Sequence, residues 1–275
     1  ARRRGAGQPR GLLVGGRGVV LAPWSSVRDA DLFLALAMDG HGADGRVGLA
    51  SAIEASWLPL TRHGVLRWDE ELQRVLALEE ERYRDLVLGE RRTSADPEAA
   101  ATLLAEVART DLRGALRLEP HEGFRTRVAS LRRWRPEHRL PACDDDAVAA
   151  LLPSVCVGKS SLAELRSVDL GPWLRGLYDH EQLQLLEREA PASIAIPSGR
   201  RAALTYHEDG SAPICAVKLQ ELFGLQQTPR VAGGKVSVLL HLLAPNGRPV
   251  QVTQDLESFW RRTYTEVRKE LRQRY

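Results

Sequence analysis

Two glycine-lysine segments are the parts of this chain whose residue types and spacing come nearest to phosphate chemistry. Gly158-Lys159-Ser160 matches the end of a phosphate-binding loop, G-x-x-x-x-G-K-[ST], in which several backbone N–H groups surround the phosphates. The first glycine of that pattern is replaced by Pro153, which has no N–H and a fixed φ. We therefore interpret this segment as a loop followed by a helix cap. Gly233-Gly234-Lys235 leads into a predicted strand, which leaves two interpretations, a flexible turn or a basic loop that touches RNA.

The other reactive residue types do not form a catalytic or metal-binding pattern. The seven histidines lack the H-E-x-x-H spacing of zinc enzymes, and no G-x-S-x-G nucleophile elbow is present. Cys143, Cys156 and Cys215 are far apart and form no C-x-x-C pair, which argues against a disulfide framework and a zinc ribbon. We expect no catalytic residue, metal or cofactor in this chain, and a location in the reducing cytoplasm.

Nucleic-acid contact is the chemistry that the arginine side chains suggest. A first group of basic residues lies at the N-terminal end: Arg2, Arg3, Arg4, Arg10 and Arg17. A second group is spread over the C-terminal part: Arg230, Lys235, Arg248, Arg261 and Arg262. Arginine binds phosphates, and few aromatic residues (Trp24 and Phe33) lie near the first group, so contact with the backbone is favoured over base recognition. Two alternatives stay open: a solvated arm without a ligand, and an arginine excess that reflects a GC-rich genome.

Composition places the chain among globular proteins and excludes several classes. A hydrophobic content of 43% argues against disorder, and a length of 275 residues suggests two or three structural units. The net charge of only +3 excludes a polycation. No apolar run approaches the roughly 18 residues that a membrane span needs, and no signal peptide is visible.

The N-terminal third is predicted to be a small β domain. Residues 1–10 are rich in Arg and Gly and are interpreted as a basic arm or linker. Asp44-Gly45 is well placed to reverse a hairpin. Residues 65–92 have a helix-forming composition but β-type ends, so they form either a helix or a hairpin with its turn near 70–73. Short apolar runs bounded by glycine predict strands around 12–14, 19–21, 32–38 and 47–50.

Helices are predicted from residue 94, and strands return beyond Pro191. Asp96-Pro97 combines an N-cap with a proline at the first helical position, which is typical of a helix start. Further helices are expected at about 121–134, 144–152, 160–166 and 169–189. Strands are expected at 193–196, 202–206, 214–217, 236–243 and 250–252, with helices at 219–223 and 256–274.

Four segments near the C-terminus carry a specific family resemblance. They read VKLQELFG at 217–224, TPRVAGGK at 228–235, GRPVQVTQDLESFW at 247–260 and EVRKELRQRY at 266–275. Together they resemble the C-terminal block of the HrpB family of bacterial DEAH-box ATP-dependent RNA helicases. The segment 11–40 resembles the first strands of the OB-fold-like part of that family.

The resemblance implies an α+β fold with an OB-like small β-barrel, a helical middle unit and a mixed α+β C-terminal unit. The implied domains are an OB-like β domain with a hairpin extension at 1–93, a helical unit at 94–190 and an α+β C-terminal domain characteristic of the HrpB family at 191–275. In such helicases two RecA-like lobes hydrolyse ATP with Mg²⁺, whereas the motor motifs are absent from these 275 residues.

The function implied by the resemblance is that of an accessory region. We expect this chain to brace the motor lobes of the same polypeptide and to contact single-stranded RNA, and not to hydrolyse ATP alone. ATP and Mg²⁺ would belong to the full-length enzyme. The alternative is a protein–protein interaction module that does not bind nucleic acid directly.

Overall fold

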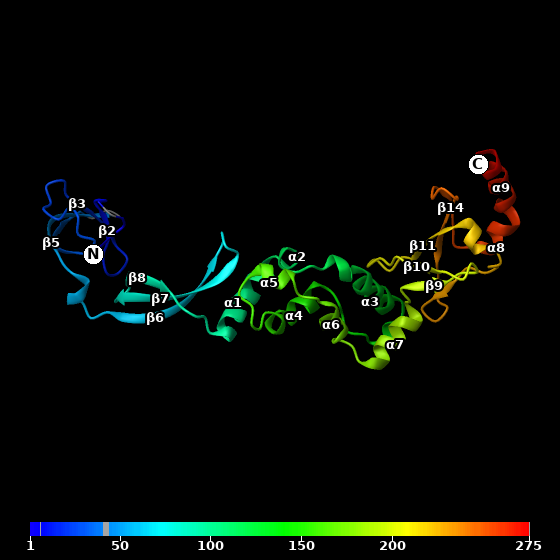
Figure 1. Cartoon of the computed structure of the whole chain (residues 1–275), viewed down its shortest axis with the longest axis horizontal. Coiled ribbons are helices and arrows are strands. Elements are labelled where there is room, and N and C mark those ends of the chain that lie inside the picture. The colour runs from blue at the N-terminus through cyan, green and yellow to red at the C-terminus, as the bar shows by residue number, and fades with distance from the viewer. Residues whose placement is uncertain (6, 41–43, 275) are drawn as a thin grey trace. The chain divides into compact units, whose positions relative to one another are not determined.

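The computed structural model describes residues 1–5, 7–40 and 44–274, which form two compact units. Unit 1 contains Ala1–Glu106 and Cys156–Leu162, and unit 2 contains Val107–Val155 and the chain from Ala163 onward. Figure 1 shows strands in the N-terminal part, helices in the middle and both kinds of element in the C-terminal part. The fold is therefore mixed α+β, as predicted. The three domains with boundaries at 93 and 190 stay a prediction.

Unit 1 begins with a five-stranded sheet in the order β1-β2-β3-β5-β4. Its strands are β1 (Arg2–Arg3), β2 (Arg10–Leu12), β3 (Gly18–Leu21), β4 (Phe33–Asp39) and β5 (Asp44–Ala52). Neighbouring strands are antiparallel except β3 and β5, which are parallel. An antiparallel bridge between Arg2 and Leu32 brings the start of β4 back to β1. The sheet therefore curves round until its two ends meet.

The inside of this curved sheet is apolar because alternate side chains of each strand point the same way. Val19 and Leu21 of β3 and Val47 of β5 are buried together with Phe33, which is fully enclosed. Gly11 of β2 leaves room for that ring, since a Cβ there would lie 3.0 Å from Phe33.

Two sequence predictions about this sheet were wrong. Residues 1–10 are not a free arm, because β1 and β2 take them into the sheet with Arg2 opposite Leu12. Asp44-Gly45 does not reverse the chain but begins β5, and the connection from β4 precedes it. Residues 41–43 of that connection lie outside the described residues.

The second sheet of unit 1 confirms the hairpin interpretation of 65–92. It contains β6 (Thr61–Asp69), β7 (Arg74–Tyr83) and β8 (Leu86–Arg92), all antiparallel, after a 3₁₀ turn at Ala55–Trp57. The turn lies at 70–73, as predicted, where the Asp69 side chain accepts hydrogen bonds from the Glu71 and Leu72 backbones. A distant segment completes the sheet, because the Val75 N–H donates to the Ser160 carbonyl at 2.7 Å.

Helices make up the middle of the chain. α1 (Pro97–Thr110) starts as predicted, with the Asp96 side chain accepting from the Ala99 N–H. Helices α2 (Leu112–Ala115), α3 (Glu122–Trp134), α4 (Asp145–Val155) and α5 (Leu162–Arg166) follow, with 3₁₀ turns at Glu119–His121 and Pro136–His138.

The predicted single helix at 169–189 is two helices, α6 (Gly171–Arg175) and α7 (His180–Glu189). The division arises because Asp179 caps the start of α7 in a capping box with Gln182.

The C-terminal strands form three small sheets. β9 (Ser193–Ala195) pairs with β10 (Arg201–Ala203), and β12 (Arg230–Val231) pairs with β13 (Val236–Ser237). β14 (Leu239–Leu243) lies between a parallel β11 (Ile214–Lys218) and an antiparallel β15 (Pro249–Thr253). The predicted strand at 236–243 is interrupted at the buried Val238, whose N–H donates to the Pro229 carbonyl instead.

The last helical segment is irregular. After β15 the chain forms α8 (Leu256–Ser258), a π-helical turn at Phe259–Thr263 and α9 (Tyr264–Arg274). A separate 3₁₀ turn at Leu219–Leu222 follows β11. Phe259 and Val267 are buried. Within the described part of the chain, no helix is long and apolar enough to cross a membrane.

Candidate nucleic-acid interface

Two arginines of the predicted N-terminal group serve the fold. Arg3 is only 5% exposed, and its guanidinium donates to the carbonyl oxygens of Ala30 at 3.0 Å, Val27 at 3.1 Å and Gln8. Arg2 donates to the Val87 carbonyl of β8. The carbonyl contacts of Arg3 use all of its nitrogens, so the structure places Arg3 inside unit 1 and not on its surface.

The other three arginines of this group are exposed. Arg17 donates to the Gly40 carbonyl at 2.9 Å. The side chains of Arg4 and Arg10 make no hydrogen bond or ion pair with the residues that the structure describes, and the Arg4 N–H donates to the Arg10 carbonyl. Arg4 and Arg10 are thus neighbours with uncommitted positive charge.

Strand register adds a residue that the sequence analysis missed. Val20 of β3 is opposite Arg10 of β2 on one side and Arg46 of β5 on the other. Its neighbours Val19 and Leu21 point into the core, so Arg10, Val20 and Arg46 share the outer surface of the sheet. Only knowledge that β3 pairs with β5 in parallel could have placed Arg46 on the same face as Arg10.

An exposed aromatic ring lies beside Arg46. Trp24 is 68% exposed, and the Arg46 guanidinium carbon lies 5.8 Å from its ring centroid, a cation–π distance. Phe33, the other aromatic residue noted in the sequence, is in the core and unavailable for stacking. A cavity of about 500 Å³ adjoins this surface and includes Val20, Arg28 and Arg46 in its lining. We call the surface formed by Arg10, Val20, Trp24 and Arg46 the β2–β3–β5 face.

The second predicted group is divided among several elements of unit 2. Lys235 donates to Glu137 at 3.1 Å, and Arg261 is paired with Glu257 one helical turn away. The remaining members are exposed, with no side-chain partner among the described residues: Arg230 on β12, Arg248 before β15 and Arg262 in the π-helical turn. RNA contact by this group stays a prediction.

The glycine-lysine loop at 232–235 is fastened by a network of charged groups. Arg135 donates to Glu189 at 2.8 Å and to the Ala232 carbonyl at 3.3 Å, and its Nε donates to Glu137 at 2.7 Å. A hydrogen bond from its own backbone N–H, followed by those from Arg135 and Lys235, lowers the pKa of Glu137 to about 2. The loop is therefore a fastened turn and not a flexible one, and RNA contact by Lys235 stays a prediction.

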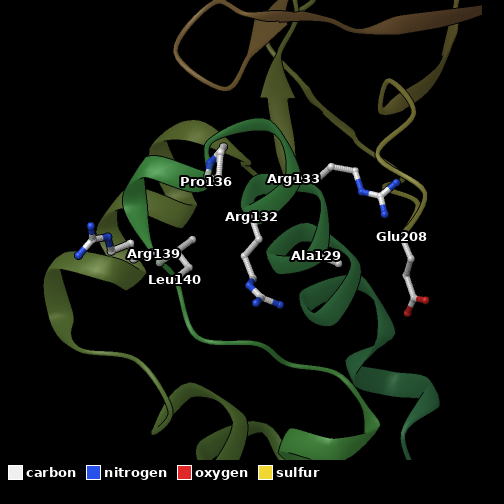
Figure 2. Close-up of a pocket in the computed structure, with 7 residues that line it drawn as sticks. All are labelled: Ala129, Arg132, Arg133, Pro136, Arg139, Leu140 and Glu208. Carbon is white, nitrogen blue, oxygen red and sulfur yellow. The ribbon is translucent and has the colours of Figure 1, made fainter.

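An arginine-rich pocket lies where α3 ends, and the sequence analysis did not identify it. Its volume is about 390 Å³. Figure 2 shows the residues that line it: Ala129, Arg132, Arg133, Pro136, Arg139, Leu140 and Glu208. The available signal was the run LRRWRPEHR at 131–139, which contains four arginines and one glutamate.

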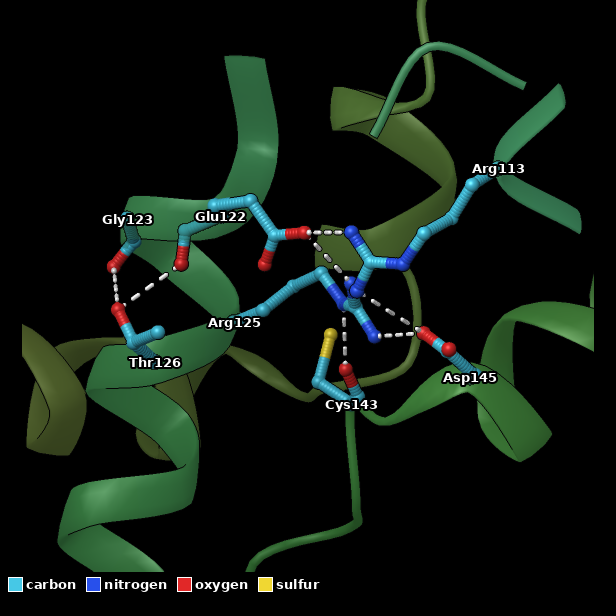
Figure 3. Close-up of polar contacts among 7 residues, drawn as sticks. All are labelled: Arg113, Glu122, Gly123, Arg125, Thr126, Cys143 and Asp145. Carbon is cyan, nitrogen blue, oxygen red and sulfur yellow. Dashed lines mark hydrogen bonds and ion pairs between the residues drawn. The ribbon is translucent and has the colours of Figure 1, made fainter. Parts of the chain in front are cut away.

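A third arginine cluster joins α3 to the start of α4 (Figure 3). Arg125 is 3% exposed and donates to the Cys143 carbonyl at 2.9 Å and to Glu122 at 3.2 Å, and it also pairs with Asp145. Arg113 donates to the same Glu122 carboxylate at 2.9 Å, and this hydrogen bond raises its pKa. Every guanidinium here has a carboxylate partner, which indicates a structural clamp.

The cysteine thiols are buried, and potential metal ligands are not grouped within the described residues. They contain no group of three His, Cys, Asp or Glu side chains placed to hold a metal ion. The three cysteines are buried free thiols, and burial raises the pKa of Cys156 and Cys215 to about 11. Gly158-Lys159-Ser160 follows helix α4 and not a strand, so the structural context of a phosphate-binding loop is absent from this segment.

Comparison with known proteins relates this chain to one family. A family model described as "ATP-dependent helicase C-terminal" (HrpB_C) matches residues 151–275. The chain is 43% identical over 159 residues to the ATP-dependent RNA helicase HrpB of Escherichia coli (strain K12), an alignment that covers 56% of this chain and 19% of that protein.

Two crystal structures of the E. coli protein are similar over nearly the whole chain. The structure of the E. coli DExH-box NTPase HrpB has a TM-score of 0.64 and 31% identity, and covers 100% of this chain and 36% of that one. The structure of the E. coli DEAH/RHA helicase HrpB has a TM-score of 0.60 and 29% identity, and covers 98% and 35%. The chain therefore spans about a third of the length of these solved relatives.

Proposed function

From the premise that this chain carries the C-terminal region of HrpB-type helicases, we propose that it is the accessory part of an ATP-dependent RNA helicase. In this role it braces the motor lobes and contacts single-stranded RNA through arginine side chains. ATP and Mg²⁺ act in the motor of the full-length enzyme, and the chain alone does not hydrolyse ATP. An ATPase assay on the isolated chain checks the last point, since RNA-stimulated turnover would contradict it.

We further propose that the five-stranded sheet is an OB-like barrel. This assignment is supported by the strand order β1-β2-β3-β5-β4, by the parallel pairing of β3 with β5, and by the Arg2–Leu32 bridge. OB-folds are partly open five-stranded barrels that receive oligonucleotides on the surface of their second and third strands. In this chain that surface is part of the β2–β3–β5 face.

The observation that carries the RNA proposal is the register of Arg10, Val20 and Arg46 beside the exposed Trp24. Guanidiniums on the two strands that flank β3 can bind phosphates of one strand of RNA, and the indole ring beside Arg46 can stack on a base of any identity. Such a surface binds single strands with little sequence preference, and its affinity falls steeply as salt rises.

Bracing of the motor is supported by an apolar surface on β4 and β5. Leu34, Leu36 and Leu49 are each more than half exposed, and Met38 lies on the same pair of strands. Exposed apolar side chains on adjacent strands are typical of a surface that another domain covers. Because the solved HrpB chains extend well beyond the part matched here, we assign this surface to contact with the helicase lobes.

The RNA proposal is tested by charge reversal on the β2–β3–β5 face. The double variant Arg10→Glu/Arg46→Glu is compared with Arg92→Glu/Arg117→Glu, which makes the same change in net charge at two exposed arginines that have no side-chain partner among the described residues. Affinity for a fluorescently labelled oligouridylate is measured by anisotropy across a salt series.

We expect the face variant to lose affinity on the order of tenfold, from two exposed charge contacts and added repulsion. Its slope of log affinity against log salt falls by about 1.4, since each phosphate contact with a single strand contributes about 0.7. An equal response from both double variants refutes the assignment. If the unmodified chain gives no RNA signal, the alternative of a protein-interaction module, which the β4–β5 surface favours, replaces it.

A further inference from the structure

We propose that the arginine-rich pocket at the end of α3 is a second phosphate-binding site, which holds the sugar-phosphate backbone of RNA in unit 2. This inference rests on the proposed RNA-binding function and extends it to a region outside the barrel. None of the basic residues predicted from the sequence lines this pocket.

The helix itself creates the basic surface. Ala129, Arg132 and Arg133 are spaced i, i+3 and i+4, so they lie on one face of α3, and Pro136 begins the 3₁₀ turn that follows. Arg139 follows at the end of the next 3₁₀ turn. The pocket thus has three guanidiniums and a single carboxylate, Glu208, in its lining.

Free charge distinguishes this pocket from the other arginine clusters of unit 2. Arg113, Arg125, Arg127 and Arg135 are each ion-paired with a carboxylate. By contrast, the exposed side chains of Arg132 and Arg139 make no hydrogen bond or ion pair with any residue that the structure describes. A guanidinium without a carboxylate partner keeps all of its donors for an incoming anion.

Arg133 has a different role from its two neighbours. Its Nη1 donates to the Asp209 carbonyl at 2.7 Å, and its aliphatic part lies against Gly210, where a Cβ would be 2.2 Å from Arg133 Cδ. This residue therefore holds the 208–210 loop at the rim. We assign phosphate contact to Arg132 and Arg139, and a supporting position to Arg133.

The backbone at Arg139 supports a functional role for this side chain. Arg139 has φ 49° and ψ 36°, a left-handed conformation that glycine or asparagine adopts at lower cost. Strained positions of this kind are concentrated at functional sites. An arginine here places a charged group at the pocket in spite of that cost.

The arrangement of the guanidiniums fits a polymer better than a small anion. Figure 2 shows the Arg132 side chain in the middle of the lining residues, with Arg139 on one side and Arg133 on the other, and their guanidiniums point apart. One phosphate cannot reach groups that diverge, whereas a strand carries a phosphate at every nucleotide. We therefore assign the pocket to consecutive phosphates of an RNA strand.

The experiment compares four proteins with the same labelled oligouridylate across a salt series. They are the unmodified chain, the pocket variant Arg132→Glu/Arg139→Glu, the charge-conserving variant Arg132→Lys/Arg139→Lys, and the control Arg92→Glu/Arg117→Glu. We expect the pocket variant to lose affinity on the order of tenfold and its salt slope to fall by about 1.4. The lysine variant keeps the slope, since it keeps the charge. Equal behaviour of pocket variant and control overturns the proposal.

Measuring the face variant Arg10→Glu/Arg46→Glu in the same titration separates this inference from the proposed function. Loss of affinity in the pocket variant but not in the face variant supports the pocket and contradicts the barrel assignment. Loss in the face variant alone keeps the proposed function and overturns the pocket. Calorimetry with inorganic phosphate supplies the last arm: saturable binding that the pocket variant loses, while its RNA affinity stays unchanged, would reassign the pocket to a free anion and overturn the proposal.

Discussion

Replacing Gly233 by alanine tests whether the charged network fastens the loop at 232–235. Gly233 has φ +62°, and a Cβ added there would lie 2.3 Å from Arg135 Nη1. Gly234 is the matched control, because it has φ +85° and nothing within 4 Å of its added Cβ. Both substitutions therefore carry the cost of a left-handed alanine, and only one displaces Arg135.

The expected magnitudes follow from these contacts. A residue with a Cβ in the left-handed region costs about 1 kcal/mol. Removing one partner of a buried ion pair costs about 3–5 kcal/mol. The side chains of Arg135 and Glu189 are 17% and 10% exposed, and a displaced arginine keeps some of its contacts, so we expect about 2 kcal/mol from this source. Gly233→Ala should then destabilise by about 3 kcal/mol and Gly234→Ala by about 1 kcal/mol.

Urea unfolding of the full chain, followed by circular dichroism, measures the difference. Hydrogen exchange of the Ala232 amide, which donates to the Glu189 carbonyl at 2.7 Å, reports the loop itself. In an Arg135→Met background the extra cost of Gly233→Ala should vanish, because the guanidinium that the added Cβ displaces is absent. Equal destabilisation by the two alanine variants in the native background would refute the fastening role of Arg135.

Three further predictions concern unit 1 and the pH dependence of the network. Arg3→Ala should destabilise unit 1 by about 3 kcal/mol in urea unfolding, because it leaves one buried and two part-buried carbonyls without their donor. Arg4→Ala should change stability by less than about 0.5 kcal/mol in the same measurement. Trp24→Ala should lower the affinity for oligouridylate on the order of tenfold through loss of a stacking partner, whereas Trp57→Ala, which removes an equally exposed ring, should leave the anisotropy titration unchanged. Because the pKa of Glu137 falls from 4.5 to about 2 on folding, the contribution of its carboxylate to folding stability is present above pH 4.5 and lost towards pH 2. The difference in melting temperature between the unmodified chain and Glu137→Gln should shrink over that interval. A difference that is independent of pH would contradict this.

Local signals in the sequence were sufficient for many elements. The Asp96-Pro97 start of α1 and the hairpin turn at 70–73 are where the pattern indicates, since caps and turns depend on a few adjacent residues. The predicted helix at 169–189 failed because its apolar spacing continues across residues 176–179, while the Asp179 capping box starts a new helix there. A cap inside a periodic segment is easily overlooked.

The candidate site was only partly predictable because its residues meet through strand pairing. Arg10 was predicted from composition, but Arg46 joins it only through the parallel pairing of β3 with β5, which no local pattern encodes. Arg3 was predicted to contact nucleic acid, but its side chain is buried, because the curved sheet brings the carbonyls of residues 27 and 30 to it. The number of arginines in a segment does not distinguish an arginine that binds phosphate from a buried one that donates to backbone carbonyls.

The backbone hydrogen bond between Val75 and Ser160 has a consequence for folding during translation and for the design of shorter fragments. A strand that emerges early in translation keeps an unsatisfied edge until a partner more than eighty positions later has left the ribosome. Fragments that end after α1 would contain the five-stranded sheet and the hairpin without that partner, and their aggregation would not contradict the fold. Any dissection of this polypeptide should therefore retain the short return segment, for example by grafting it through a flexible tether.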